Sequence, residues 1–239
     1  METEIWPNLI TQCYRKQVPV FLINARLSER SARGYERVRG LVRPVMQKIT
    51  WIAAQAEKDA ERFRRIGVAP ASVEVTGSVK FDVDITEGIR ESARQCRQIL
   101  GARPVWVAGS THAGEDEQLL EAHRAVLGQH PQALLVIVPR HPDRFGSVAE
   151  LAEKAGFNVA RRSLQQDPAH AQVYLGDTMG ELMMLYGAGD MAFVGGSLIE
   201  RGGHNPLEPA AWGIPVLSGP HVFNFETVYE RLRAGEGVV

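Results

Sequence analysis

The sequence is poor in cysteine and in net charge, and each shortage excludes a class of protein. Two cysteines, Cys13 and Cys96, occur in 239 residues without metal-type spacing, which favours free thiols in a reducing compartment. We assign no role to either of them. The formal net charge of -1 argues against a nucleic-acid-binding protein that works by bulk phosphate neutralisation.

Long apolar runs and the common catalytic fingerprints are also missing. The chain has no run of about 18 apolar residues and no secretory signal, so we expect it to be soluble and cytoplasmic. It has no G-x-G-x-x-G after a first strand, no P-loop, no H-E-x-x-H and no Ser-His-Asp order, which leaves dinucleotide, NTPase, metalloenzyme and hydrolase interpretations with little support. It opens without a first βα unit and stops as a strand begins, so we expect a fragment.

Short β-branched runs alternate with amphipathic stretches along the whole chain. A helical region reaching residue 65 and a charged helix up to residue 100 separate the first predicted strands. Apolar strands separated by helices indicate an α/β fold with parallel sheets covered on both faces, in which ligands collect at the carboxyl ends of the strands. The predicted strands are residues 18–24, 73–77, 105–109, 134–138, 173–176, 191–195 and 215–218.

The length of the chain allows two domains. Because residues 81–104 are polar and charged, we predict an N-terminal domain over 1–85, a linker over 86–103 and a C-terminal domain over 104–239. Basic residues outnumber acidic ones about two to one over residues 26–65, which is typical of a surface that meets a polyanion or a membrane.

Three loops after predicted strands carry candidate ligand contacts. Residues 109–117 place acids in the first turn of a helix, where capping is a simpler interpretation than phosphate contact. Arg140 could bind a phosphate or carboxylate, or pair with a neighbouring acid in a surface turn. Thr178 and Glu181 have capping-box spacing, while Gly180 inside that first turn favours close approach of a ligand.

A fourth, glycine-rich loop at residues 195–209 leads from a strand into a helix. Asn205 can serve as the N-cap, Pro206 fits the first helical position and Glu208 the third, so the positive end of the helix would suit a phosphate. Two interpretations of Glu208 stay open. It either satisfies the backbone of Asn205 or accepts bonds from both hydroxyls of a ribose.

Other polar residues have weaker local signals. Glu2 would lie on a strand and Lys80 at a strand exit, where surface salt bridges are the ordinary interpretation, although a Lys80 facing an interdomain cleft would meet an anionic ligand. The seven histidines are not expected to cluster. His141 and His204 lie beside proposed ligand loops, and we assign neither a role.

Six motifs follow one another over nearly the whole chain. They are METEIWPNLI at 1–10, NARLS at 24–28, VTGSVKFD at 75–82, VPRHP at 138–142, GDTMGELMMLY at 176–186 and FVGGSLIERGGHNPLE at 193–208. Together they resemble the Kdo transferases, which move 3-deoxy-manno-octulosonic acid (Kdo) from CMP-Kdo to lipid A precursors in lipopolysaccharide synthesis.

The resemblance implies a GT-B fold, in which two Rossmann-like domains, the first of them incomplete here, face each other across a cleft. It also implies that the C-terminal domain binds the donor CMP-Kdo. The family motifs that contact CMP correspond here to Pro139, Arg140, Met179, Gly180, Glu181, Asn205, Pro206, Leu207 and Glu208.

The resemblance further implies that Glu2 and Lys80 stabilise the transition state of an inverting single displacement that needs no metal or other cofactor. The family's general base lies in a Ser-Val-Gly-Glu motif, which this chain lacks, so we expect the isolated chain to bind CMP weakly and to transfer nothing. The implied acceptor is a lipid A precursor, lipid IVA. The implied location of the parent protein is the cytoplasmic face of the bacterial inner membrane, and no nucleic acid is expected as a partner.

Two other interpretations stay open. A GT-B-like epimerase acting on a UDP-sugar would share the two sheets and the ribose-binding carboxylate, and a preference for uridine would favour it. A non-catalytic remnant would fold and bind nucleotide or a partner protein without catalysis. Folding without binding of any nucleotide would favour that interpretation.

Overall fold

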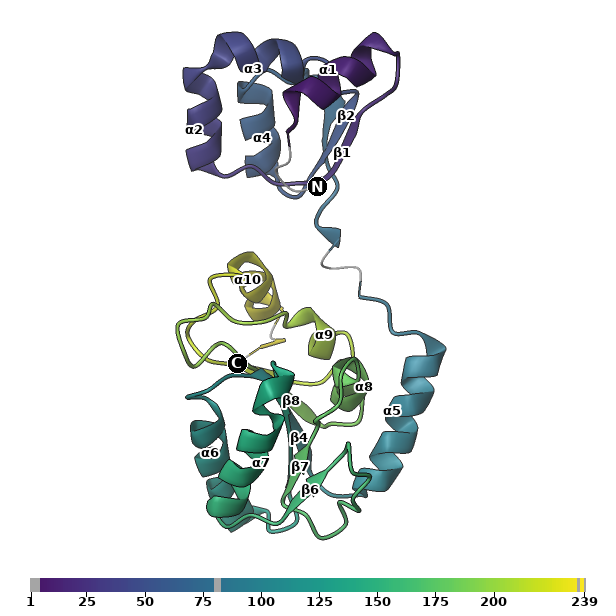
Figure 1. The fold of residues 1–239 in the computed structure, drawn as a ribbon, viewed down its shortest axis with the longest axis vertical. Helices are drawn as coiled ribbons and strands as arrows, with labels where there is room; N and C mark the ends of the chain where they lie inside the picture. The colour runs from purple at the N-terminus through teal and green to yellow at the C-terminus, as the bar shows by residue number, and fades with distance from the viewer. Residues whose placement is uncertain (1–4, 80–82, 236, 239) are drawn as a thin grey trace. The chain divides into compact units, whose positions relative to one another are not determined.

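The structure is a computed structural model that describes residues 5–79, 83–235 and 237–238. The chain divides into two compact units, Met1–Asp82 and Val83–Val239, whose elements are shown in Figure 1. Within the described residues, no helix combines the length and the apolar character that crossing a bilayer requires.

The first unit is built on a three-stranded parallel sheet with the order β1-β2-β3. The α-helices among its described residues and the inner face of the sheet share one core, in which Leu22, Ile52 and Phe63 are buried. Phe21 and Ile23 point to the other side of β1 and are more than half exposed. The elements are α1 (Pro7–Arg15), β1 (Phe21–Ala25), α2 (Glu29–Arg37), α3 (Arg39–Met46), β2 (Trp51–Ala54), α4 (Glu57–Arg65), the 3₁₀ turn η1 (Pro70–Ser72) and β3 (Val73–Val75).

The central strand of this sheet, β2, lies inside the region that the sequence predicts to be helical, and that prediction is wrong at this point. Ile52 pairs with Leu22 of β1 and with Val73 of β3, so its backbone is hydrogen-bonded on both sides. Its side chain is fully buried. This pairing is between residues far apart in the sequence. The strand has only four residues and no turn signals flank it, so the local sequence did not indicate a strand.

The second unit holds a six-stranded, all-parallel sheet with the order β6-β7-β5-β4-β8-β9. Val238 adds an isolated parallel bridge beside Val216. The elements are α5 (Glu87–Leu100), β4 (Val105–Thr111), α6 (Asp116–Gln129), β5 (Leu134–Pro139), η3 (Pro142–Arg144), α7 (Phe145–Lys154), β6 (Val159–Arg161), β7 (Val173–Leu175), α8 (Leu182–Gly187), β8 (Met191–Val194), α9 (Leu207–Ala210), β9 (Val216–Ser218) and α10 (Glu226–Ala234).

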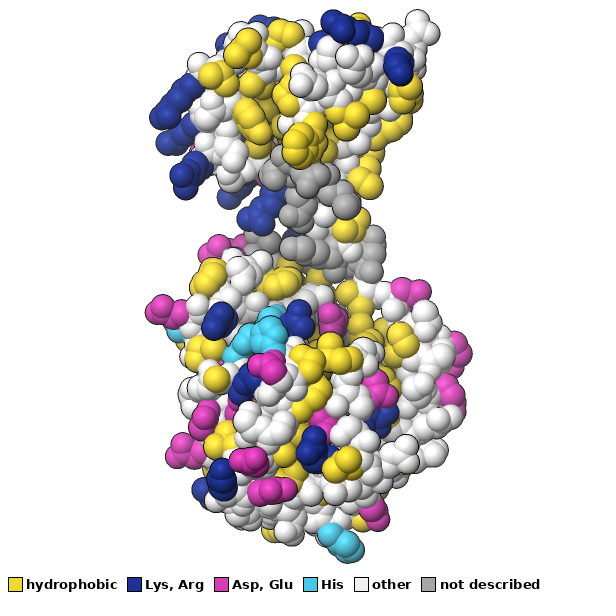
Figure 2. Space-filling view, viewed as in Figure 1, with side chains coloured by type: hydrophobic (Ala, Val, Ile, Leu, Met, Phe, Trp, Pro, Cys, Tyr) yellow, Lys and Arg dark blue, Asp and Glu magenta, His cyan; other side chains and the backbone are white. Residues whose placement is uncertain are grey.

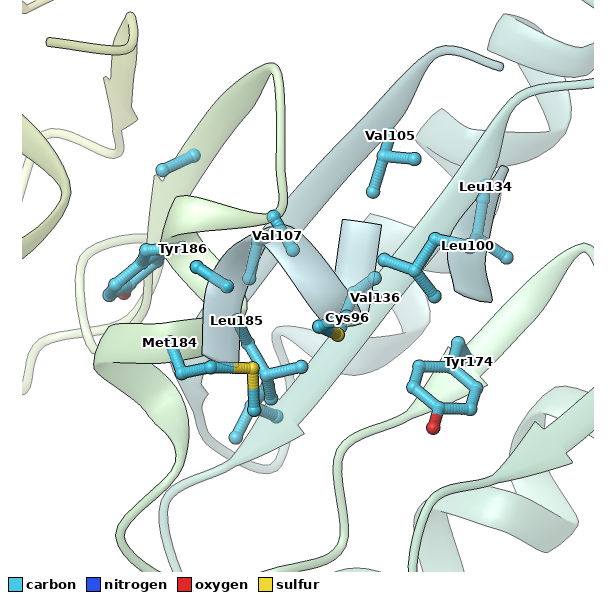
Figure 3. Packing of buried hydrophobic residues seen from close by; sticks show 14 of the residues in the cluster. Cys96, Leu100, Val105, Val107, Leu134, Val136, Tyr174, Met184, Leu185 and Tyr186 are labelled. Atoms are coloured by element: carbon cyan, nitrogen blue, oxygen red, sulfur yellow. The ribbon is translucent and has the colours of Figure 1, made fainter. Parts of the chain in front are cut away.

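Both faces of the larger sheet are covered, as its apolar strands require. Alternate residues along β4 point to opposite faces: Val107 packs with α5 and α8, and Ala108 with α6 and α7. Figure 3 shows the first of these cores, a single cluster to which Cys96 and Leu100 of α5 and Tyr186 of α8 all belong. The α/β class with doubly covered parallel strands is therefore confirmed for this unit.

The segment predicted to be a linker has a different role in the structure. Residues 87–100 form helix α5, which packs against α8 and contributes buried residues to the core of the second unit. The units divide between Asp82 and Val83, slightly before the predicted boundary at 85. The charged residues that suggested a linker form the solvent-facing side of an amphipathic helix capped by Thr86.

The seven predicted strands all occur, with boundaries that differ by up to three residues. A short edge strand, β6, was not predicted. It pairs only with β7, and of its three residues only Ala160 is buried. Such a strand has almost no hydrophobic periodicity to detect.

Candidate functional site

The candidate site lies at the carboxyl edge of the six-stranded sheet, where the loops after β4, β5, β7 and β8 begin. The strand after β4 in the chain, β5, lies on one side of it, and β8 lies on the other side. The strand order therefore reverses between β4 and β8, and ligands of open α/β sheets bind outside such a switch point. The loops after β5, β7 and β8 carry all the residues of this unit that the sequence predicts to contact a nucleotide.

Arg140 and Glu208 come from two of these loops. Arg140 directly follows Pro139, the last residue of β5, and its backbone N–H donates to Thr111 O at 3.0 Å. Its side chain is exposed, and none of the described residues forms a hydrogen bond or ion pair with the guanidinium group. Burial raises the pKa of Glu208, while the Asn205 amide and the charge of Arg140 oppose that increase. The cation and the carboxylate therefore interact electrostatically, and the guanidinium remains available to a ligand.

The turn into helix α9 differs in detail from the predicted capping box. Asn205 Oδ1 accepts from the Leu207 N–H at 3.1 Å, as an N-cap does, and the helix begins at Leu207, just after Pro206. Glu208 Oε1, however, accepts from the side-chain amide of Asn205 at 3.5 Å. Asn205 thus orients the Glu208 carboxylate, whose second oxygen is left for another donor.

Glu181, in the loop after β7, is held by a residue that the sequence reasoning overlooked. Arg162, just beyond β6, donates from Nε and Nη2 to the two carboxylate oxygens, each at 2.6 Å. Thr178 donates its hydroxyl to the same carboxylate. These bonds, with Arg162 first, lower the pKa of Glu181. Helix α8 begins only at Leu182, so the predicted capping box of Thr178 and Glu181 is replaced by this ion pair.

The two residues before Glu181 form the exposed part of the same loop. Met179 is 65% exposed. Gly180 has a φ of +78° and open space where a side chain would begin. The left-handed backbone is a conformation that favours glycine, and the sequence had suggested close approach of a ligand as the reason for this residue.

The backbone N–H groups of the glycine-rich loop after β8 bind a buried carboxylate of the protein. Glu115, at the start of α6, is completely buried, and its carboxylate accepts from the backbone N–H groups of Gly196, Ser197 and Leu198 at 2.7 to 3.0 Å. It also accepts from the N–H of His112 at 3.0 Å. These donors are therefore occupied by a carboxylate of the protein, so Glu115 ties two loops together where capping alone was predicted.

Three histidines meet at this edge, which corrects the expectation that the histidines do not cluster. His112 Nε2 and His204 Nε2 lie 2.7 Å apart, and the His141 ring contacts the His112 ring at a centroid distance of 5.5 Å. Burial, followed by the nearby charges of His112 and Arg140, lowers the pKa of His204 to about 4. The described residues contain no group of three or more His, Cys, Asp or Glu side chains arranged to hold a metal ion.

The two residues predicted to stabilise the transition state, Glu2 and Lys80, lie outside the described residues. The segment that leads to position 80 is described as far as Val79. Its N–H donates to Asn24 Oδ1 at 3.3 Å, and Asn24 has a left-handed backbone at the end of β1.

Three residues of the site were missed from the sequence: His112, Glu115 and Arg162. Glu115 was interpreted only as a capping acid, because its partners lie more than eighty residues further along the chain. Arg162 follows the edge strand that gave no signal. The sequence shows each of them as a polar residue after a strand, but it does not indicate which residue each one contacts.

Comparisons with known proteins agree with this architecture. Residues 1–83 match the family model of 3-deoxy-D-manno-octulosonic-acid transferase (kdotransferase). Over 241 residues, the chain is 44% identical to the 3-deoxy-D-manno-octulosonic acid transferase of Haemophilus influenzae, covering 100% of this chain and 56% of that protein. It is 38% identical to the Bordetella pertussis protein of the same name, covering 95% of this chain and 53% of that protein. The chain thus spans about half the length of these curated relatives.

Solved structures also match the chain. The crystal structure of the C-terminal CMP-Kdo binding domain of WaaA from Acinetobacter baumannii is 39% identical, with a TM-score of 0.61, and the match covers 64% of this chain and 82% of that domain. UDP-GlcNAc 2-epimerase from Methanocaldococcus jannaschii matches 96% of this chain at 13% identity with a TM-score of 0.54, which shows a shared fold alone. The two parallel α/β units, with the candidate loops at the carboxyl edge of the larger sheet, place the protein in the GT-B class. The high-identity matches are more specific, and the chain belongs to the Kdo transferase family.

Proposed function

We propose that this chain carries the donor half of an enzyme that transfers Kdo from CMP-Kdo to a lipid A precursor, lipid IVA. The observation that carries the proposal is the 39% identity, over 64% of this chain, to a domain described as binding CMP-Kdo. The loop residues implied by the family resemblance follow strands β5, β7 and β8 at one edge of the sheet.

The donor contacts follow from the chemistry of these loops. Arg140 offers an exposed guanidinium that can bond a phosphate or carboxylate oxygen through two N–H groups. Glu208, oriented by Asn205, accepts from the ribose hydroxyls. Pro139, Pro206 and Leu207 hold the backbone on either side of these two groups.

Glu181 contributes through the loop that it anchors. Both of its carboxylate oxygens are bonded by Arg162 and one also by Thr178, so the carboxylate is largely satisfied within the protein. The exposed surface of this loop is formed by Met179 and Gly180, which would pack against the nucleotide. Arg162 then acts as a positioning residue for the Met179–Gly180 contact.

The transfer step is an inverting single displacement that uses no metal. The acceptor hydroxyl attacks the anomeric carbon of Kdo, CMP leaves, and a general base from a part of the enzyme outside this chain removes the hydroxyl proton. Glu2 and Lys80 stabilise the transition state, in which negative charge grows on the departing phosphate. Without that base the isolated chain transfers nothing, although it binds CMP weakly.

We assign binding of the acceptor and of the membrane surface to the first unit. Exposed basic residues follow one another along α2 and α3, including Arg30, Arg37 and Arg39. Figure 2 shows Lys and Arg side chains along the edge that α2 forms in Figure 1. A basic surface attracts the phosphates of lipid A and of anionic lipids, which supports a location at the cytoplasmic face of the bacterial inner membrane.

Calorimetric titration of CMP into the purified chain tests the donor assignment, with UMP as the control nucleotide. Glu208→Ala removes two hydroxyl contacts, so CMP should bind roughly tenfold or more weakly. Glu200→Ala, which removes an exposed carboxylate from the same loop, is the matched control and should leave the affinity unchanged.

Three outcomes would contradict parts of the proposal. A preference for UMP would favour a UDP-sugar epimerase. A folded chain that binds neither nucleotide would support the non-catalytic interpretation. Kdo transfer to lipid IVA by the 239-residue chain alone would overturn the assignment of the base to a missing part.

A further inference from the structure

The three clustered histidines are not used by the proposed donor contacts. His112 follows β4, His141 follows β5 and His204 lies in the loop after β8, so three different loops bring them to the carboxyl edge. The rings of His112 and His204 are nearly parallel, at 9°, with centroids 5.0 Å apart. Figure 2 shows histidine side chains gathered in one patch of this unit, with Lys or Arg side chains beside it.

The 2.7 Å separation of the two Nε2 atoms restricts how many protons the pair can carry. A hydrogen bond at this distance requires one Nε2–H donor and one Nε2 lone pair. In the uncharged pair, the donor ring therefore has a free lone pair on Nδ1, and the acceptor ring carries its proton on Nδ1. One further proton can enter at the free Nδ1 without breaking the bond, but a second would place two N–H groups face to face.

The charges that face the pair come from four elements. His112 experiences Glu115 of the α6 start, His141 and Arg144 of the β5 loop and turn η3, and Arg201 of the glycine-rich loop. The charges that act on His204 are those of His112, Arg140, Glu115 and His141. Glu115 is the only acid among these groups, and its carboxylate is already bonded by four backbone N–H groups.

These surroundings favour the uncharged pair in the free protein. Burial is the largest cause that lowers the pKa of both His112 and His204, and the arginines and neighbouring histidines act in the same direction, whereas the charge of Glu115 opposes them. An anion bound among these cations would reverse that electrostatic effect and favour a charged imidazolium ring.

We propose that the His112–His204 pair takes up one proton from solvent when the phosphate of a cytidine nucleotide binds beside Arg140. This inference rests on the proposed donor function and adds to it the uptake of one proton on binding. The pair changes from zero to one positive charge, the Nε2–Nε2 hydrogen bond is kept, and the new charge faces the phosphate.

Proton uptake on binding has a measurable consequence. Affinity must rise on acidification wherever the bound pair is protonated and the free pair is not, by up to about tenfold per pH unit for one proton. The phosphate of free CMP itself titrates near pH 6. A cytidine phosphodiester avoids this complication because its phosphate keeps one charge, as does that of a CMP-sugar.

The test is calorimetry of cytidine 5′-(methyl phosphate) binding to the full chain, in pairs of buffers with different ionisation enthalpies, between about pH 5 and about pH 8. The dependence of the enthalpy on the buffer gives the number of protons taken up. We expect a value approaching one for the unaltered chain. His204→Asn and His112→Asn should each abolish the uptake, whereas His170→Asn, at an exposed histidine, should retain it.

Cytidine without phosphate is the second arm, and it should bind with no proton uptake. Phosphodiester binding with an enthalpy independent of the buffer would overturn this inference while leaving the donor function standing. Retained uptake in both His112→Asn and His204→Asn would also overturn it, because the proton would then enter elsewhere. A folded chain that binds no cytidine phosphate would overturn the donor function and this inference together.

Discussion

Glu115 Oε2 accepts a hydrogen bond of 2.7 Å from the backbone N–H of Gly196, which joins the first residue before α6 to the glycine-rich loop after β8. The two loops flank the switch point between neighbouring strands β4 and β8. A buried carboxylate here replaces the phosphate that a glycine-rich loop binds in many α/β proteins. The loop is therefore fixed in shape before any ligand arrives.

Replacing this carboxylate by its amide tests the structural role directly. Glu115→Gln keeps the size of the side chain but turns an NH₂ group toward backbone N–H donors, which leaves buried donors without partners. We expect the free energy of unfolding to fall by about 2 to 4 kcal/mol, measured by urea titration. Glu117→Gln, an exposed position on the same helix, should change it by less than about 0.5 kcal/mol. Equal stability of the two variants would show that the Glu115 bonds contribute nothing net.

The strands differ in how far the sequence alone predicts them. Apolar strands of five or more residues, such as β4 and β5, carry their burial in their own composition, and both were predicted. Two of the four residues of β2 are alanines, and β6 has a single buried residue, so neither segment gave a strand signal of its own.

The candidate site was also predictable only in part. Arg140 and Glu208 follow strands in recognisable motifs, and the family resemblance named them. Partner choice was not predictable, because Glu181 pairs with Arg162 across two separate loops and His112 meets His204 ninety-two residues away. Local spacing predicts which residues reach the edge of a sheet, but the three-dimensional arrangement decides which of them touch.

The ion pair between Arg162 and Glu181 should be measurable as a coupling between the two side chains. Two short, parallel bonds to a partly buried carboxylate form the geometry in which such pairs are strongest. A double-mutant cycle with Arg162→Ala and Glu181→Ala, followed by chemical unfolding, should give a coupling free energy of about 1 to 3 kcal/mol. The same cycle on the exposed Glu150–Lys154 pair should give at most about 0.5 kcal/mol. A coupling for Arg162 and Glu181 no larger than for that control would refute the anchoring role of Arg162.

The lowered pKa of His204 predicts how the ligand-free protein responds to acid. Its pKa is about 4 in the folded chain, whereas the ordinary value of 6.5 applies to the unfolded chain. Between these two pH values the unfolded state therefore binds more protons than the folded state. Stability must therefore fall as the pH falls through that window, and the loss is complete below about pH 4. One full proton corresponds to about 1.4 kcal/mol per pH unit, and solvent screening at this half-buried ring makes the observed slope smaller.

Removing the ring should remove this part of the acid sensitivity. Unfolding free energies measured by urea titration from about pH 7 down to about pH 4.5 should decline less steeply for His204→Asn than for the unaltered chain. At neutral pH the variant loses the bond to His112 and should be less stable by about 1 kcal/mol, so the two curves converge on acidification. His170→Asn, which removes an exposed histidine, should run parallel to the unaltered chain throughout. Parallel curves for His204→Asn as well would mean that His204 has the same pKa in the folded and unfolded states, contrary to its burial among cations.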